Sequence, residues 1–261
     1  MINNKEAKKD TRVALVFAVK SSELTKDSSK MACELLTEQR KEKVDKKHFV
    51  GDKNNCIAAG LLLNYAVSYY VKLSRRNGNT KNNQVIINDD MLDNGKMKHD
   101  IIYVTIDELI NSYDKSYDYK IATKENGKPY FVEHRDIYFN LSHSGEYAVC
   151  VIGNTENGID IEGKSENVLK TAKRFFSENE YNWIVCGVNE KEQLIRFLRL
   201  WTLKESYSKL TGKGIAYGIN EALFTIDKGK INFLDKEKKE KYKIYQSFIE
   251  EYVLTTIHSK L

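Results

Sequence analysis

The sequence predicts an α+β protein built from two similar lobes that meet near Thr155. Strand-type and helix-type segments mix in both halves, and each half follows the same coarse order of strand, helices and strands. A chain of 261 residues, 41% of them hydrophobic, can bury one large core or two modest ones. No residue-level repeat is visible, so the division rests on element order. The order of elements assigns residues 1–155 to one lobe and 156–261 to the other.

The first half begins with a strand signal and continues with helices. Valine and alanine enrichment predicts a strand at 12–20, and apolar residues at helical spacing predict a helix around 31–36. The apolar run 56–71 predicts a buried helix, because Asn64 and Ser68 interrupt it and it is shorter than a membrane span. A loop is predicted at 75–84, followed by strands at 99–106 and 136–142.

The second half contains the strongest helix signal of the chain, residues 192–210, which ends at the glycines of TGKG. Another helix is predicted at 166–176. A third starts at Ser177, because Ser177 and Glu180 have the spacing of a capping box. This capping box accounts for the presence of Glu180 without a catalytic role. Short strands are predicted at 222–227, 230–235, 241–249 and 252–258.

Composition argues against several classes of protein. The four cysteines are far apart and form no C-x-x-C, so a zinc ribbon or a redox pair is not indicated and we expect reduced core residues. The net charge of +5 comes from lysine runs rather than one basic face, so charge alone does not predict nucleic-acid binding. The N-terminus lacks a signal-peptide pattern, and we expect a cytoplasmic protein without a membrane segment.

Two acids lie in the apolar segment GIDIE. Side chains two residues apart in a strand share a face, so Gly158, Asp160 and Glu162 point one way. Ile159 and Ile161 then point into the core. An edge strand whose acids face water explains this pattern, and so does a site for Mg²⁺, which prefers carboxylate oxygens and shares its shell with phosphates.

The strong helix carries a polar stripe. Trp201, Glu205 and Lys209 follow at four-residue steps and therefore share one face. A helix-stabilising Glu–Lys pair beside a core tryptophan is one interpretation. A third metal ligand and a lysine that neutralises phosphate is the other.

His143 is in the string SHSG, which predicts a tight polar loop. No partner has the spacing of a Ser-His-Asp triad, so nucleophilic hydrolysis is weakly supported. Small residues beside an imidazole do fit around a phosphate, through hydroxyl and backbone N–H donors.

Five strings occur in order between Gly127 and Gly214: GKP, FNLSHSG, GIDIE, RFFSENE and WTLKESYSKLTGKG. Together they resemble the 4'-phosphopantetheinyl transferases of the larger, Sfp-like type. The resemblance implies a pseudo-two-fold pair of α+β lobes, with coenzyme A in the cleft between them and Mg²⁺ on its pyrophosphate. Such an enzyme moves the phosphopantetheine arm to a serine of an apo acyl carrier or peptidyl carrier protein and releases 3',5'-ADP.

The resemblance also implies roles for acids and a lysine of the second half. In the family, the residues matching Asp160, Glu162 and Glu205 hold the metal. The acid matching Glu180 is a candidate for taking the serine proton, and the lysine matching Lys209 contacts phosphate. Glu180, Glu205 and Lys209 are therefore the candidate catalytic residues.

The remaining implied contacts are to the phosphates of coenzyme A. The family residues matching Lys128, Ser142 and His143 contact phosphate. Arg40 and Lys43 match a basic pair that grips the 3'-phosphate.

The chain departs from the family pattern at one visible position. Many relatives carry an arginine where this chain has Asn55 and Cys56, with Lys53 as a substitute cation nearby. The departure predicts a weaker grip on the nucleotide without affecting the metal ligands.

Two other functions use the same residues. A metal-dependent phosphohydrolase would need the same acids but no carrier, and a non-catalytic module would bind coenzyme A or a carrier protein without turnover. The sequence does not select among fatty-acid, polyketide and nonribosomal-peptide carriers. We expect a monomer, because the cleft would lie within one chain.

Overall fold

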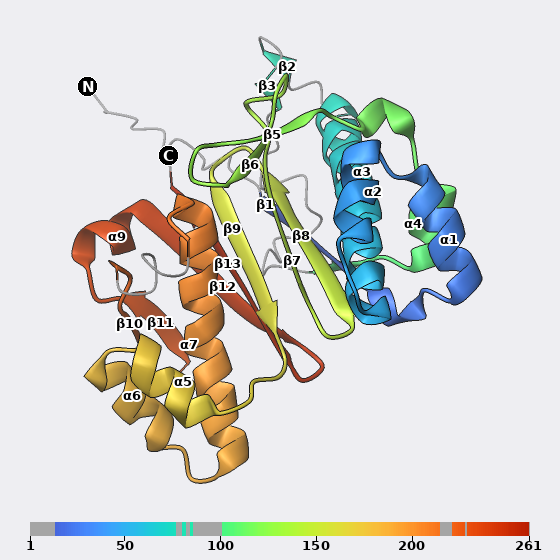
Figure 1. The fold of residues 1–261 in the computed structure, drawn as a ribbon. Coiled ribbons are helices and arrows are strands. Elements are labelled where there is room, and N and C mark those ends of the chain that lie inside the picture. The colour runs from blue at the N-terminus through green and yellow to red at the C-terminus, as the bar shows by residue number, and fades with distance from the viewer. Residues whose placement is uncertain are drawn as a thin grey trace, which may run out of the picture.

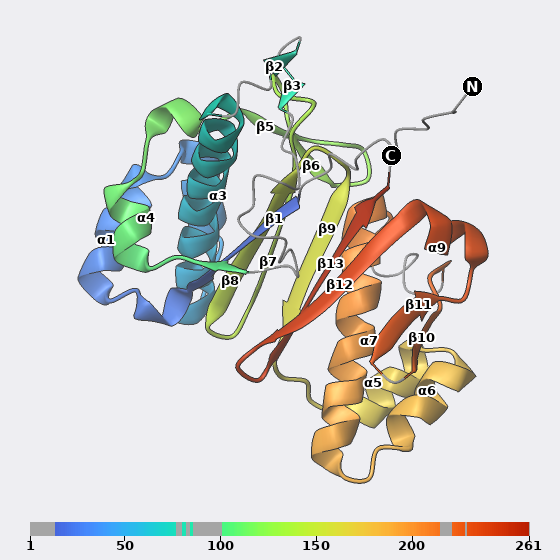
Figure 2. The same cartoon turned by 180° about the vertical axis from the view of Figure 1, so that it is seen from behind.

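The computed structural model describes residues 14–76, 80–81, 84–85, 101–214, 221–227 and 229–260. Helices and largely antiparallel sheets occur in both halves, as predicted for an α+β protein. Figures 1 and 2 show the two halves side by side, with strands of both at the centre and helices on the outside.

The central sheet of the first half has the strand order β4-β1-β8-β7. Its pairs are antiparallel except for the short parallel contact of β1 with β4. The strands are β1 (Ala14–Lys20), β4 (Ile102–Tyr103), β7 (Tyr138–Ser144) and β8 (Tyr147–Gly153). Every residue of β8 is buried, because β8 lies inside the sheet and both of its faces are covered.

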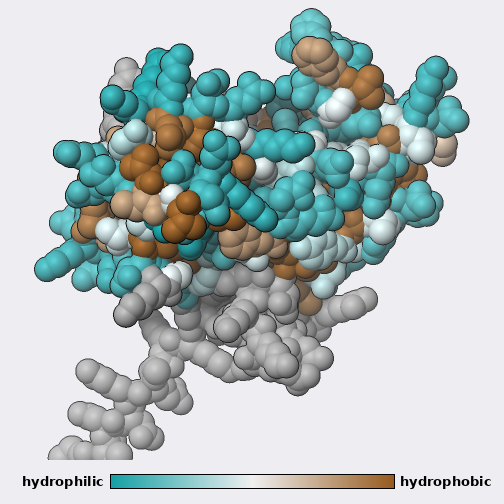
Figure 3. Space-filling model, turned by 90° about the horizontal axis from the view of Figure 1, so that it is seen from below, coloured by the Kyte–Doolittle hydropathy of each residue, from teal (hydrophilic) through white to brown (hydrophobic). Residues whose placement is uncertain are grey.

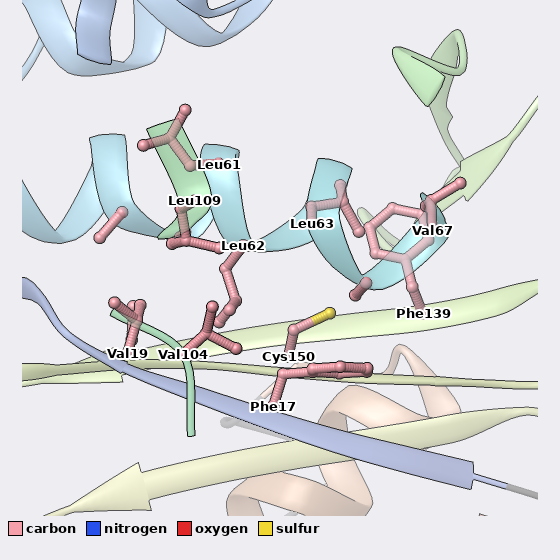
Figure 4. Packing of buried hydrophobic residues seen from close by; sticks show 14 of the residues in the cluster. Phe17, Val19, Leu61, Leu62, Leu63, Val67, Val104, Leu109, Phe139 and Cys150 are labelled. Carbon is pink, nitrogen blue, oxygen red and sulfur yellow. The ribbon is translucent and has the colours of Figure 1, made fainter. Parts of the chain in front are cut away.

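The helices of the first half cover one face of this sheet. They are α1 (Lys26–Leu35), α2 (Glu38–Asp45), α3 (Val50–Arg76) and α4 (Ile106–Asn111). Figure 4 shows Leu62 of α3 facing Phe17 of β1 and Cys150 of β8. Helix α3 is long and apolar enough to cross a membrane, but 78% of its most apolar window is buried within the protein. Packing against the sheet accounts for its apolar character.

The second half has a sheet of order β12-β13-β9 and a long helix against it. Its strands are β9 (Asn157–Glu162), β12 (Tyr242–Ile249) and β13 (Tyr252–Ser259). The helices are α5 (Val168–Phe175), α6 (Glu178–Val185), α7 (Glu190–Thr211) and α9 (Lys236–Lys241). Strand β9 lies beside β7 of the first sheet, so the two sheets meet at the centre of the molecule.

Short elements connect these layers. They are the 3-10 helices η1 (Ser21–Glu23) and η4 (Lys115–Tyr117), and hairpins formed by β2 (Thr80–Lys81) with β3 (Gln84–Val85), β5 (Ile121–Thr123) with β6 (Pro129–Phe131), and β10 (Phe224–Asp227) with β11 (Lys230–Phe233).

The predicted elements of the first half are found with different bounds. The strand at 12–20 is β1 from residue 14 onward, and the buried helix at 56–71 extends over Val50–Arg76. Of the strand predicted at 99–106, residues 102–103 form β4 and residues 99–100 lie outside the described residues. The prediction is wrong from Val104 onward, because the Thr105 side chain accepts a hydrogen bond from Glu108 N and starts α4. The predicted loop at 75–84 lies partly outside the described residues.

The cysteine prediction holds only in part. All four thiols are free, and Cys56 and Cys150 are buried. Cys186 is exposed and Cys33 is half-buried, so these two are not core residues.

Helix α7 lies directly on strand β9 at Gly158. A Cβ atom placed on Gly158 would be 2.1 Å from the Ser206 carbonyl oxygen and 2.6 Å from Leu210 N, both in the backbone of α7. Real side chains do not approach backbone atoms so closely, so any other residue here would push helix and strand apart. The missing side chain thus fixes the distance between the two elements that carry the conspicuous acids.

We expect Gly158→Ala to lower the free energy of unfolding by about 2–3 kcal/mol, because the methyl group must displace backbone atoms. Gly51→Ala is the matched control, since nothing lies within 4 Å of a Cβ placed at Gly51. This control should change the free energy of unfolding by less than about 0.5 kcal/mol. Urea denaturation measures both. Equal stability of the two variants would contradict the close contact.

Candidate functional site

Asp160 is at the centre of a polar cluster formed by β7, β9 and α7. Its Oδ1 accepts hydrogen bonds from Ser142 Oγ and from Lys209 Nζ, both at 2.8 Å. Lys209 Nζ also donates to Ser142 Oγ, which closes a triangle of polar groups. Only 6% of Asp160 is exposed, so this carboxylate depends on these partners.

Glu162 is two residues further along β9 on the same face. Its Oε1 accepts from Ser144 Oγ at 2.5 Å and from Gly163 N at 3.1 Å. Two successive acids of β9 thus bind two serines of β7 that are themselves two residues apart. Because side chains two residues apart share a face of a strand, the serine-bearing face of β7 lies opposite the acid-bearing face of β9 over both pairs.

Glu205 of α7 completes the acidic cluster. Burial raises the pKa of its carboxyl group to about 7, and the negative charges of Asp160 and Glu162 act in the same direction. Lys209 opposes this effect. The three acids predicted from the sequence therefore interact electrostatically, although they come from a strand and a distant helix.

The donor set has the chemistry of a hard-cation site. Carboxylate oxygens suit Mg²⁺, and an acid whose pKa is raised by burial and by two other acids is stabilised in its charged form by a cation. Within the described part of the chain, however, no three His, Cys, Asp or Glu side chains are arranged as a ready-made metal site. Lys209 Nζ is hydrogen-bonded to Asp160 Oδ1. The residues thus fit a metal by type and charge, and their metal role stays a prediction.

The SHSG string is not the loop predicted from the sequence. Ser142, His143 and Ser144 belong to β7, and strand pairing continues to Ser144 opposite Tyr147. The turn therefore consists only of Gly145 and Glu146. The alternation of the strand directs the two serines to the acids of β9.

His143 is close enough to charged groups for its pKa to change. The pKa is lowered, first by desolvation and then by the positive charges of Lys47 and Lys209. Asp52 and Asp160 oppose this effect. The lowered pKa favours the neutral imidazole, which borders the acidic cluster beside two lysines, and the contact of His143 with phosphate stays a prediction.

Comparisons with known proteins match the part of the chain that carries the acids. Residues 156–257 match the family model described as 4'-phosphopantetheinyl transferase superfamily, and this range contains Asp160, Glu162, Glu205 and Lys209. The 4'-phosphopantetheinyl transferase gsp of Aneurinibacillus migulanus is 47% identical over 124 residues, which cover 47% of this chain and 50% of that protein. For the transferase Sfp of Bacillus subtilis (strain 168) the identity is 42% over 103 residues, covering 40% of this chain and 45% of that protein.

The resemblance to the Sfp-type 4'-phosphopantetheinyl transferases is confirmed. A third relative of the same description, psf-1 of Bacillus pumilus, is 42% identical over 98 residues, or 38% of this chain and 42% of that protein. The chain spans about half the length of the curated relatives it matches.

Lys128, for which the 4'-phosphopantetheinyl transferase resemblance implies a phosphate contact, is bound to protein oxygens. Its Nζ donates to the carbonyl oxygens of Leu210 at 2.7 Å and Asn157 at 3.1 Å, and to the carboxylate of Glu156. Burial lowers the pKa of Lys128, although Glu156 opposes this effect. In this structure Lys128 joins the end of α7 to the start of β9, and its phosphate contact stays a prediction.

Glu180, the candidate base of the family, has a structural role here. The capping box with Ser177 is confirmed, and Glu180 Oε1 accepts from Phe224 N at 3.2 Å. Its Oε2 is 3.1 Å from Lys204 Nζ, and both side chains are 1% exposed. The contacts with Lys204 and Phe224 tie α6 to α7 and β10. The role of Glu180 as a base stays a prediction.

Arg40 and Lys43, the implied 3'-phosphate pair, are both on α2. Arg40 lines a pocket of about 220 Å³ together with Tyr113 and Tyr119. Among the described residues no hydrogen bond or ion pair of the Arg40 side chain is found, and burial lowers the pKa of its guanidinium group. Lys43 is exposed and does not line this pocket. An unpaired, half-buried cation in a pocket is suited to an anionic ligand.

Sequence reasoning missed two contributors to this site. Ser144 binds Glu162, and it would have been found had SHS been assigned to a strand, since Ser142 and Ser144 then share a face. Lys204, the buried partner of Glu180, has no local signal beyond its position before Glu205. Trp201 is partly buried and packs on the core residue Phe197 with ring centroids 5.5 Å apart, so its interpretation as a core residue holds in part.

We predict that Glu205→Gln stabilises the metal-free protein at alkaline pH. The folded pKa of about 7 is above the ordinary value of 4.5, so the folded state holds the proton more tightly. Wild-type stability therefore falls as the pH rises from 4.5 to 7, by up to about 3 kcal/mol. Urea unfolding with a chelator should show the variant to be more stable at pH 8 and equal at pH 4.5. A difference that does not depend on pH would contradict the raised pKa.

Proposed function

We propose that this protein transfers the 4'-phosphopantetheine group of coenzyme A to a serine hydroxyl of an apo acyl carrier or peptidyl carrier protein. The serine oxygen forms a bond to the phosphorus that carries pantetheine, the P–O bond of the pyrophosphate breaks, and 3',5'-ADP leaves. The observation that carries the proposal is the cluster of the buried acids Asp160 and Glu205 and the half-buried Glu162 beside Lys209, in the region that matches the family model.

Each residue of the cluster has a task in this reaction. Asp160, Glu162 and Glu205 would hold Mg²⁺, which neutralises pyrophosphate charge when it is bound. Lys209 adds positive charge on the side of Ser142, and Ser142 and His143 offer donors to phosphate oxygens. Arg40 and Lys43 would hold the 3'-phosphate, and Lys128 would add a further phosphate contact. Glu180 is the proposed acceptor of the serine proton.

The arrangement of the two halves supports a cleft site. We propose that residues 1–155 and 156–261 are two lobes related by a pseudo-two-fold axis, with coenzyme A between them. In support, α3 packs on β1, β8 and β7 of one sheet as α7 packs on β9 and β13 of the other. A cleft within one chain needs no second subunit, so we further propose that the protein is a monomer. We also propose that it acts in the cytoplasm.

Purified protein should raise the mass of an apo carrier protein by one phosphopantetheine group when coenzyme A and Mg²⁺ are present. Intact-protein mass spectrometry with a panel of fatty-acid, polyketide and nonribosomal-peptide carriers measures this and identifies the carrier class. Release of phosphate-containing product without any carrier would instead indicate a phosphohydrolase. Coenzyme A binding without turnover on every carrier would indicate a non-catalytic module.

Asp160→Asn should reduce transfer by at least about 100-fold while the protein stays folded, because it removes the central carboxylate charge of the cluster. Asp227→Asn, in an exposed residue of β10, is the matched control and should retain full activity. Steady-state kinetics and circular dichroism compare the two. Full activity of a folded Asp160→Asn variant would remove the role of the cluster.

Mg²⁺ should stabilise the wild-type protein at pH 8, because the metal would bind three ionised acids in the folded state only. We expect an increase in Tm at millimolar Mg²⁺ for wild type and none for Asp160→Asn. Differential scanning fluorimetry measures the change, and a chelator should reverse it. An equal shift for both proteins would indicate non-specific binding elsewhere.

A further inference from the structure

The turn between β7 and β8 is held by both halves of the protein. It consists of Gly145 and Glu146 and follows directly after Ser142, His143 and Ser144. Figure 1 shows this turn at the lower end of the central strands, between the beginning of α3 and the tip of the β12–β13 hairpin, and Figure 2 shows the same arrangement from behind.

Asn55 of α3 holds the turn from the first half. Its Nδ2 donates a hydrogen bond to the Gly145 carbonyl oxygen at 3.0 Å, and its Oδ1 accepts one from Ser21 Oγ. Ser21 N in turn donates to the Glu146 carbonyl oxygen at 2.7 Å. Asn55 is only 4% exposed, so both polar ends of a buried amide are used at this one point.

Tyr252 of β13 holds the same turn from the second half. Its hydroxyl oxygen accepts a hydrogen bond from Glu146 N at 3.2 Å. Gly145 has φ +52°, and a Cβ placed there would be 2.2 Å from the Tyr252 hydroxyl. Tyr252 therefore lies directly against the turn, and glycine is the residue that fits at position 145.

The position of the turn determines what β7 presents to β9. Ser144 Oγ binds Glu162, and Ser142 Oγ binds Asp160 and is bound by Lys209. The face of the strand carrying these serines, and His143 on the other face, would shift together if the turn shifted.

We propose that Asn55 is a positioning residue for coenzyme A binding, because it fixes the β7–β8 turn and with it Ser142, His143 and Ser144. This inference rests on the proposed function. The sequence indicated that Asn55 weakens the grip on the nucleotide. The contacts instead give it the task of placing the side chains that would meet the phosphates.

The test compares Asn55→Leu with Asn54→Leu. Leucine has a similar size but offers no hydrogen bond, and Asn54 is the adjacent residue of α3. Asn54 makes two comparable bonds, from Ser29 Oγ and to the Leu24 carbonyl oxygen, and neither involves the turn. Loss of packing or of helix stability alone would affect both variants alike.

We expect Asn55→Leu to raise the KM for coenzyme A by about tenfold while kcat stays within about threefold, as for the loss of a buried hydrogen bond that orients a ligand contact. Amide hydrogen exchange in a peptide spanning residues 141–150 should become faster. Asn54→Leu should change neither quantity.

Tyr252→Phe is a second variant, for the case that Asn55→Leu does not fold. It removes only the hydroxyl group that binds Glu146 N, and it should change KM and exchange in the same direction. Equal KM values and equal exchange for the variants at positions 54 and 55 would overturn the proposal, and so would a normal KM in Tyr252→Phe together with faster exchange.

Failure of the proposed function would look different, because wild type would then neither bind coenzyme A nor load a carrier. In that case, slow amide exchange in wild type with fast exchange in Asn55→Leu still establishes that Asn55 positions the turn.

Discussion

The close contact between α7 and β9 at Gly158 is the constraint on which the candidate site depends. A helix normally stands away from a strand by the size of the side chains between them. Here the strand has no side chain at the crossing point, and the backbone of α7 at Ser206 and Leu210 comes up against it. This proximity lets Lys209 of α7 reach Asp160 of β9, and it brings Glu205 within the field of the same carboxylate.

Buried charges on either side of this contact are balanced by specific partners. Lys128 neutralises Glu156 and binds the backbone ends of α7 and β9. Glu180 and Lys204 form a second pair that is almost inaccessible to water. Burial of one ion without its partner would be costly, so these pairs constrain how the helices sit on the sheet. The acidic cluster differs, because among the described residues three acids share one hydrogen-bonded lysine, Lys209, and this imbalance is what a bound metal ion would relieve.

The two strands that face each other at the site are held by different means. β9 is paired with β13 and covered by α7, whereas β7 is paired with β8 and ends at the turn that Asn55 and Tyr252 fix. Because hydrogen bonds from both halves meet at this turn, the site is positioned by both halves of the protein rather than by one of them. A change in either half that moves the turn therefore also moves the groups that would contact coenzyme A.

The sequence by itself determined the residue types and the local periods. Alternation in GIDIE placed Asp160 and Glu162 on one face, and helical spacing placed Glu205 and Lys209 on another, because these patterns depend only on neighbours in the chain. The extension of β7 through Ser144 and the pairing of Lys128 with Glu156 and of Lys204 with Glu180 were decided by tertiary structure. Each of them depends on contacts between residues far apart in sequence, and no local pattern encodes such contacts.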